Sequence, residues 1–202
     1  MFELFLPFFL LFLCILGIFF IWRINARKFV SSGTVASAYD AWTEDKLLER
    51  LWGEHIHLGF YPSGRKNIDF RKAKVQFVHE LVKWSGLDKL PKGSRILDVG
   101  CGIGGSSRIL SKSYGFNVTG ITISSAQVKR ARELTPSGLN CTFQVMDALN
   151  LKFEDGSFDA VWSVEAGAHM NDKTRFADEM LRTLRPGGYF ALADWNLSLI
   201  HI

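Results

Sequence analysis

The chain begins with an unbroken apolar run. After it, apolar residues recur at helical spacing in some segments and form short strand-like runs in others. Residues 4–22 contain no charged side chain. At about 1.5 Å per residue, a helix of this length just crosses a hydrocarbon core of roughly 30 Å. Arg23, Arg27 and Lys28 follow the run, whereas a cleaved signal peptide carries its basic residues in front. The pattern predicts a membrane anchor over residues 1–28, with a buried core helix as the alternative. Its basic flank places the folded part on the cytoplasmic side.

Two helical patterns follow a polar linker at 23–34. Apolar side chains recur at helical spacing from Val35 to about Leu58, and again from Asp69 to Trp84. Residues 59–64 between them are rich in turn formers. We expect residues 29–90 to form a helical lid or substrate region.

From Arg95 onward, short strand patterns alternate with helical ones. Strands are expected at 95–99, 116–121, 141–146, 158–164 and 189–194. Helices are expected from the glycine loop after the first strand to about 114, at 125–134 and at about 173–184. This alternation predicts right-handed βαβ units, and therefore an α/β fold in which helices cover both faces of a parallel sheet. Residues 91–202 form the predicted core.

Charge and cysteine content exclude several function classes. The net charge is +4, and basic residues are interspersed with acidic ones, so no stripe suits a nucleic-acid backbone. Three cysteines without a CxxC pair indicate neither a zinc site nor a disulfide framework. A mildly basic protein beside an apolar segment fits anionic lipid headgroups.

A glycine-rich segment, Ile-Leu-Asp-Val-Gly-Cys-Gly-Ile-Gly-Gly at 96–105, follows the first predicted strand. Its G-x-G-x-x-G spacing alone would also suit a dinucleotide site. Such a site uses an acidic residue at the end of the second strand, but residues 120–124 contain none. Asp98, just before the first glycine, would repel a pyrophosphate and attract an ammonium or sulfonium group. The loop therefore favours a cationic cofactor.

This segment resembles motif I of the class I S-adenosylmethionine-dependent methyltransferases, whose fold is Rossmann-like. Their later motifs are matched in order at 147–148, 155–163 and 181–190. Segments 52–59, 102–108, 120–124 and 162–170 are similar to the tocopherol and sterol methyltransferase group. The apolar beginning and residues 39–45 are most similar to cyanobacterial members that act on 2-methyl-6-phytyl-benzoquinol. Members of the group continue past the fifth strand, so the resemblance implies a fragment without the C-terminal strands.

The resemblance implies S-adenosylmethionine as the cofactor and assigns residues to it. Asp98 would bind the amino group, Thr122, Ser124 and Gln127 the ribose, Asp147 the adenine, and Tyr39 would close a lid. The loop residues that would line the cofactor are Gly100, Cys101, Gly102 and Gly104. Three alternatives stay open: a plain strand residue for Thr122, a helix N-cap for Asp147, and core packing for Tyr39.

Methylation of a ring carbon needs an electron-rich ring, which a base provides by taking a phenolic proton. Glu165 and His169 lie just past the fourth strand, at the edge where such sheets bind ligands. His55, within the segment 52–59, is the third candidate. A structural hydrogen-bonding role is the alternative for each.

The expected function is S-adenosylmethionine-dependent C-methylation of a prenylated benzoquinol in tocopherol and plastoquinone biosynthesis. A membrane and a lipophilic quinol are the expected partners, and nucleic acid is not. Two alternatives stay open: methylation of γ-tocopherol or a sterol, and a fragment that binds the cofactor without activity. The sequence does not set the oligomeric state.

Overall fold

The computed structural model describes residues 14, 16, 17, 32–63 and 68–194. It divides the chain into two units, with the boundary between Ala38 and Tyr39. Most of the predicted anchor at 1–28 lies outside the described residues. Among the residues that are described, no helix is both long and apolar enough to cross a membrane. The sheet and its covering helices all belong to the second unit.

Five parallel strands form one sheet in the order β3-β2-β1-β4-β5. The strands are β1 (Arg95–Val99), β2 (Asn117–Thr122), β3 (Cys141–Val145), β4 (Phe158–Val164) and β5 (Leu184–Ala193). Four of the five lie within a residue of their predicted bounds. The strands β1 and β4 are buried on both faces and read as nearly continuous apolar runs, which is why the sequence located both at their exact bounds.

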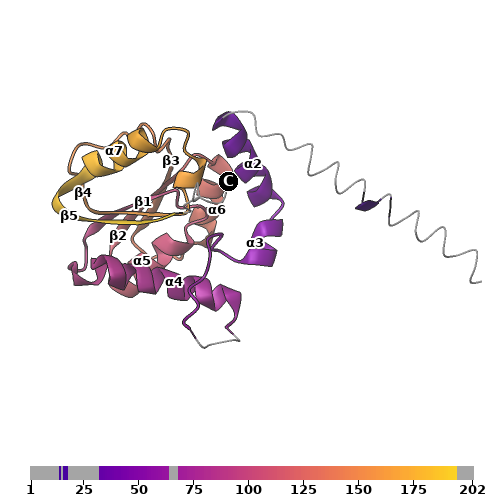
Figure 1. Cartoon of the computed structure of the whole chain (residues 1–202), viewed down its shortest axis with the longest axis horizontal. Helices are drawn as coiled ribbons and strands as arrows, with labels where there is room; N and C mark the ends of the chain where they lie inside the picture. Colours follow the sequence, from indigo (N-terminus) through magenta and orange to yellow (C-terminus); the bar gives the residue numbers. More distant parts are fainter. Residues whose placement is uncertain (1–13, 15, 18–31, 64–67, 195–202) are drawn as a thin grey trace, which may run out of the picture. The chain divides into compact units, whose positions relative to one another are not determined.

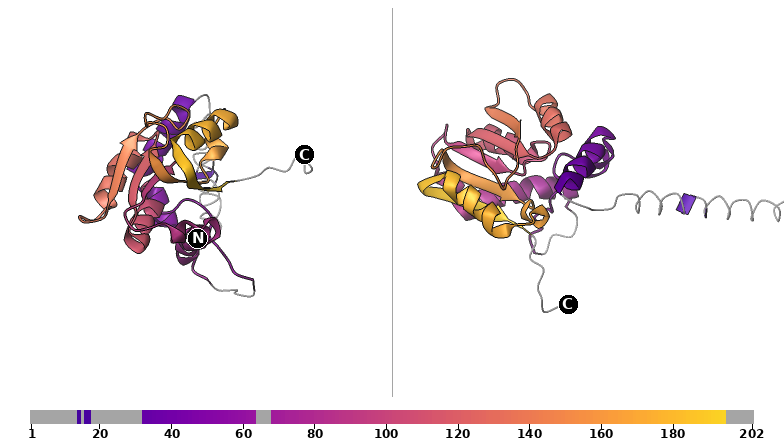
Figure 2. Two further views of the ribbon diagram at one scale, coloured as in Figure 1. Left: turned by 90° about the vertical axis from the view of Figure 1, so that its left-hand side faces the viewer. Right: turned by 90° about the horizontal axis from the view of Figure 1, so that it is seen from above.

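Helices cover both faces of the sheet, as predicted (Figure 1). The helices of the second unit are α3 (Leu47–Trp52), α4 (Phe70–Ser85), α5 (Gly105–Tyr114), α6 (Ser125–Leu134) and α7 (Lys173–Thr183), with short 3-10 turns η1 (Leu87–Lys89) and η2 (Gly167–His169). In Figure 1, α4 and α5 lie below the sheet and α7 lies above it, and the views of Figure 2 show the same layers. The helices α5 and α6 link β1, β2 and β3, whereas α7 links β4 to β5.

Among the described residues, three apolar clusters hold these layers together, and the smallest packs Val128 and Ala131 of α6 on Phe143 of β3. On one face, Val82 of α4 and Leu110 of α5 pack with Trp162 of β4. On the other face, Met180 of α7 packs with Leu97 and Val161. The helix α4 lies within the predicted lid region 29–90, yet it is part of the core layer. The predicted domain bounds at 28 and 90 stay predictions, and the structure places its one division elsewhere.

The predicted helix over 35–58 is wrong in its length. The structure has two helices there, α2 (Ser32–Glu44) and α3. Lys46 between them adopts a left-handed backbone with φ 53°, and the Leu47 N–H binds Asp45 Oδ1 at 2.8 Å. This local bond offers the backbone an alternative to a continuous helix.

The start of the fifth strand also differs from the prediction. β5 begins at Leu184 rather than at Tyr189, and the predicted turn at 185–188 lies inside it. Phe158 pairs with Leu184, but Ala160 pairs with Tyr189, so the extra residues bulge out of the ladder. Gly187, with φ 74°, supplies the left-handed conformation that such a bulge favours.

Candidate functional site

The site lies at the carboxyl ends of β1, β2 and β4, under a lid formed by residues 39–58. In Figure 1, α3 lies beyond one end of the strands. Three contacts join the lid to this edge. Asp40 Oδ1 accepts from Ser124 Oγ at 2.5 Å, Tyr39 Oη lies 2.9 Å from His169 Nε2, and the Leu58 N–H donates to Glu165 Oε1 at 3.1 Å. Ser124 follows β2, whereas Glu165 and His169 follow β4, so the lid contacts the sheet on both sides of the central strand β1.

The glycine loop after β1 requires glycine for two distinct reasons. Gly100, Gly102 and Gly104 have φ of 79°, 54° and 80°, a region that side chains disfavour. A Cβ on Gly100 would lie 2.4 Å from Ala166 Cβ, and one on Gly104 would lie 2.7 Å from Phe143 Cζ. A Cβ on Gly102 would meet nothing within 4 Å, so the loop is open on that side.

Asp98, at the foot of this loop, is 2% exposed. Ser107 Oγ donates to its Oδ2 at 2.5 Å, and no cation pairs with it among the described residues. Burial without a compensating charge raises the pKa of the Asp98 carboxyl to about 7, and the Ser107 hydrogen bond opposes the rise. Burial also raises the pKa of the neighbouring Cys101 thiol, which therefore stays protonated.

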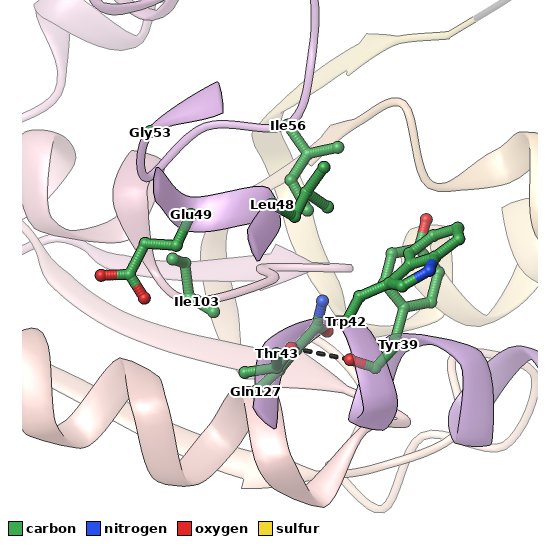
Figure 3. A pocket seen from close by; sticks show the side chains of 9 residues that line it. All are labelled: Tyr39, Trp42, Thr43, Leu48, Glu49, Gly53, Ile56, Ile103 and Gln127. Carbon is green, nitrogen blue, oxygen red and sulfur yellow. Dashed lines mark hydrogen bonds between the residues drawn. The ribbon is translucent and has the colours of Figure 1, made fainter. Parts of the chain in front are cut away.

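A pocket opens between the lid and the glycine loop (Figure 3). The space between its walls is about 310 Å³, and this volume includes space that is open to solvent. Its lining residues are Tyr39, Trp42, Thr43, Leu48, Glu49, Gly53, Ile56, Ile103 and Gln127. The mixture of aromatic, aliphatic and hydroxyl or amide groups is typical of small-molecule sites.

The predicted ribose contacts, Thr122 and Gln127, lie together at the end of β2. Thr122 Oγ1 donates to Gln127 Oε1 at 2.7 Å, and both side chains are buried. Ser124 Oγ accepts from the Gln127 N–H and caps α6. Of this group, Gln127 lines the pocket, so Thr122 is its buried support.

The carboxylates of Asp40, Glu49 and Glu54 bind the lid to the helices α5 and α6. Asp40 also accepts from the Ala126 N–H at the start of α6. Glu49 receives two hydrogen bonds from Arg130, at 2.7 and 2.8 Å. Glu54 binds Arg108 Nη2 at 2.6 Å. A bidentate guanidinium–carboxylate pair fixes orientation as well as distance, so α3 is held in one pose on α6.

The first two catalytic candidates contact different residues of the lid, Glu165 the Leu58 N–H and His169 the Tyr39 hydroxyl. Glu165 has φ 52°, unusual for a residue with a side chain. Such a conformation costs of order 1–3 kcal/mol and concentrates at functional sites. The pKa of the Tyr39 hydroxyl is raised by burial first and by the negative charge of Glu165 second. Tyr39 therefore stays protonated near neutral pH while it contacts His169.

The third candidate, His55, lies in a chain of hydrogen bonds. His57 Nδ1 lies 2.7 Å from the Leu58 carbonyl, so it donates there, and its Nε2 accepts from His55 Nδ1 at 3.1 Å. His55 keeps a lone pair on Nε2. Burial, His57 and nearby cations lower the pKa of His55 to about 3, which disfavours it as a proton acceptor. Its catalytic assignment stays a prediction.

Asp147 is exposed, and its Oδ1 accepts from the Leu149 N–H at 2.9 Å. This contact closes a turn. It is similar to the helix N-cap that was the alternative to adenine binding for this residue. The contact uses one of the two carboxylate oxygens, and the adenine assignment stays a prediction.

Lys74 and Asp40 are two residues of the site that were not predicted from the sequence. Lys74 is 3% exposed, and its Nζ donates to the carbonyls of Trp52 and His55 at 3.0 and 2.7 Å. Burial lowers the pKa of Lys74 to about 8. Its helical spacing from Phe70 on the apolar side of α4 could have marked it as buried. Nothing near Asp40 in sequence indicates that it reaches α6.

A protein-family model described as "Methyltransferase domain" matches residues 97–192. The "2-methyl-6-phytyl-1,4-hydroquinone methyltransferase" of Synechocystis sp. is 60% identical over 176 residues, which cover 87% of this chain and 55% of the relative. The "Tocopherol O-methyltransferase, chloroplastic" of Arabidopsis thaliana is 41% identical over 165 residues, which cover 75% of this chain and 47% of the relative. The chain thus spans about half the length of these relatives.

Solved structures share the architecture. The [4+2]-cyclase SpnF matches with a TM-score of 0.74 and 29% identity, over 81% of this chain and 60% of that one. A putative sarcosine dimethylglycine methyltransferase from Galdieria sulphuraria matches with a TM-score of 0.70 and 30% identity, over 77% of this chain and 59% of that one.

Proposed function

Because the chain belongs to the class I S-adenosylmethionine-dependent methyltransferases of the tocopherol methyltransferase group, we propose that it methylates a ring carbon of a prenylated benzoquinol. The substrate class is that of the relative named for 2-methyl-6-phytyl-1,4-hydroquinone, a step toward tocopherol and plastoquinone. The whole protein would work at a membrane, with its predicted anchor at residues 1–28 and its folded part on the cytoplasmic side. The apolar run at 4–22 supports this placement.

The observation that carries the proposal is the buried carboxylate of Asp98, which has one hydrogen bond and no cation. A ligand ammonium on the glycine loop would supply the positive charge that this carboxylate lacks. The left-handed glycines would allow the backbone to approach such a ligand closely, and there is open space beside Gly102. These features fit the amino-acid end of S-adenosylmethionine.

The rest of the pocket fits the nucleoside end. Gln127, held by Thr122 and by the cap of Ser124, presents an amide beside Ile103 and Thr43. An amide can both donate to and accept from ribose hydroxyls. Tyr39 and Trp42, with ring centroids 5.3 Å apart, give the lid side an aromatic wall. Asp147 remains our proposed adenine contact.

When bound, the cofactor supplies an electrophilic methyl group on a sulfonium. The protein contributes alignment and the exclusion of water, because in-line displacement depends mainly on the geometry of approach. The lid contacts of Asp40 and Tyr39 would hold this geometry. We assign Glu165 as the base that takes a phenolic proton, since its carboxylate lies at the carboxyl edge beside the lid. The hydrogen-bonded pair of Tyr39 and His169 would orient the substrate oxygen.

A second candidate substrate is a tocopherol, because a relative named for that substrate is 41% identical to this chain. One experiment separates the candidates. The full chain is titrated with S-adenosylmethionine by calorimetry and then assayed for methyl transfer to 2-methyl-6-phytyl-1,4-hydroquinone and to γ-tocopherol. Faster transfer to the hydroquinone supports the first proposal. Binding without transfer to either phenol favours an inactive cofactor-binding fragment, and the absence of binding overturns the cofactor site.

A further inference from the structure

An apolar surface is formed by exposed side chains of the lid and of the residues just after it. Seven large hydrophobic side chains between Leu47 and Tyr61 are each 38–59% exposed. They are Leu47, Leu51, Trp52, Ile56, Leu58, Phe60 and Tyr61. Elsewhere in the described chain, large exposed hydrophobic side chains are scattered. A concentration of this kind marks an interaction site, whereas single exposed residues need no explanation.

The surface is held as one piece by contacts with α4. The ring centroids of Trp52 and Phe70 are 6.1 Å apart, and the Phe60 N–H donates to the Ala73 carbonyl at 2.9 Å. Arg71 Nη2 donates to the carbonyls of Arg50 and Leu51 at 3.0 and 3.2 Å. The exposed side chains are thus carried by backbone that is fixed on a core helix.

The charges around this surface favour an anionic partner. Arg50, Arg71 and Lys72 are exposed, and none of them forms an ion pair within the described part of the chain. Of the acids near this surface, Glu49 binds Arg130 and Glu54 binds Arg108. Glu44 and Asp45 are exposed beside Leu47 without an ion pair among the described residues, and the exposed Lys46 follows them directly.

Another nearby acid, Asp69, accepts from the first N–H groups of α4. Its charge is therefore partly neutralised by the helix that it caps. An apolar centre with Trp and Tyr, flanked by unpaired cations, has the composition of a membrane-interface segment.

We propose that residues 47–61 dock onto the surface of a membrane that contains anionic lipids. Ile56 belongs both to this surface and to the lining of the pocket beneath it. A lipophilic substrate could therefore pass from the bilayer to the pocket beside Ile56. This second statement rests on the proposed function, but membrane docking itself is measured without any methyl transfer.

The test uses tryptophan quenching by lipids brominated on their acyl chains, with the full chain on vesicles of phosphatidylcholine and phosphatidylglycerol. Trp52→Phe is compared with Trp84→Phe. Trp84 is 79% exposed at the far end of α4, so it is a matched exposed tryptophan outside the docking surface. Phenylalanine at position 52 keeps an aromatic ring under Lys74 Nζ, which lies 5.0 Å from the Trp52 ring centroid.

We expect bromolipid to quench the Trp84→Phe protein as strongly as the unaltered chain, and the Trp52→Phe protein clearly less. Any quenching of Trp22 in the predicted anchor is common to all three proteins and cancels in the comparison. Equal quenching of the two variants would overturn the proposal. So would a lipid-free dimer that shields Trp52 from aqueous iodide, because a second copy would then occupy the surface. Neither result bears on cofactor binding, which the calorimetric titration measures separately.

Discussion

Replacing Asp98 with asparagine tests whether a buried charge in this protein serves a ligand rather than the fold. Burial raises the pKa of Asp98 from its ordinary value of 3.8 to about 7. That rise corresponds to roughly 4 kcal/mol of folding free energy, at about 1.4 kcal/mol for each tenfold change in the ionisation equilibrium. The folded chain bears this cost only when the carboxylate is ionised.

The direction in which stability changes with pH depends on whether the folded or the unfolded chain holds the Asp98 proton more tightly. Below pH 4 the Asp98 side chain is protonated in both the folded and the unfolded chain. Between pH 4 and pH 7 the unfolded chain loses this proton first, so the stability of the unaltered protein falls as the pH rises. Asparagine carries no charge at any pH. We therefore expect Asp98→Asn without ligand to be the more stable protein at pH 8, by up to roughly 4 kcal/mol in urea unfolding.

Cofactor binding should change in the opposite direction. If a ligand ammonium keeps Asp98 ionised, affinity in the unaltered protein rises by up to roughly fifty-fold between pH 5 and pH 7, because below pH 7 binding must release the Asp98 proton. An α-amino group stays charged over this range. We expect Asp98→Asn to bind S-adenosylmethionine at least tenfold more weakly at pH 7, with a flatter pH dependence, in calorimetric titration.

The matched control is Asp178→Asn, which makes the same change at an exposed position on α7. It should alter neither the unfolding free energy by more than about 0.5 kcal/mol nor the affinity for the cofactor. If Asp98→Asn bound the cofactor as tightly as the unaltered chain, or if affinity did not depend on pH, the reasoning about Asp98 would be refuted.

Three further changes test the lid. Tyr39→Phe removes the hydroxyl that lies 2.9 Å from His169 and should lower kcat at least tenfold while the affinity for S-adenosylmethionine stays within threefold; a loss confined to binding would contradict the orienting role. Gly105→Ala places a Cβ 2.6 Å from the Glu54 carbonyl oxygen and should weaken cofactor binding about tenfold in calorimetry, whereas Gly138→Ala, whose Cβ would meet nothing within 4 Å but whose φ of 98° is strained, should lower stability without weakening binding. Arg130→Met breaks the bidentate pair with Glu49 and should lower the unfolding free energy by about 1 kcal/mol and speed tryptic cleavage after Arg50; unchanged cleavage would argue against a lid held by this pair.

The sequence determined the scaffold because the scaffold depends on local patterns. β1, β4 and α6 occupy their predicted residues, since a buried strand needs a short apolar run and a capped helix needs a serine such as Ser124 in front. The glycine loop and Asp98 were found for the same reason. Their spacing within ten residues indicates both the turn and the sign of charge that it accepts.

Only the tertiary structure decided how the lid meets this scaffold. Asp40 and Ser124 are 84 residues apart, and Tyr39 and His169 are 130 residues apart, yet each pair is in hydrogen-bond contact. No periodicity marks either contact, because each depends on where two strand ends and one helix come together in space. The pKa of Asp98, the proton positions on His55 and His57, and the burial of Lys74 follow from the same packing. Burial and neighbouring charge are properties of the folded surroundings, and the order of residues along the chain does not contain them.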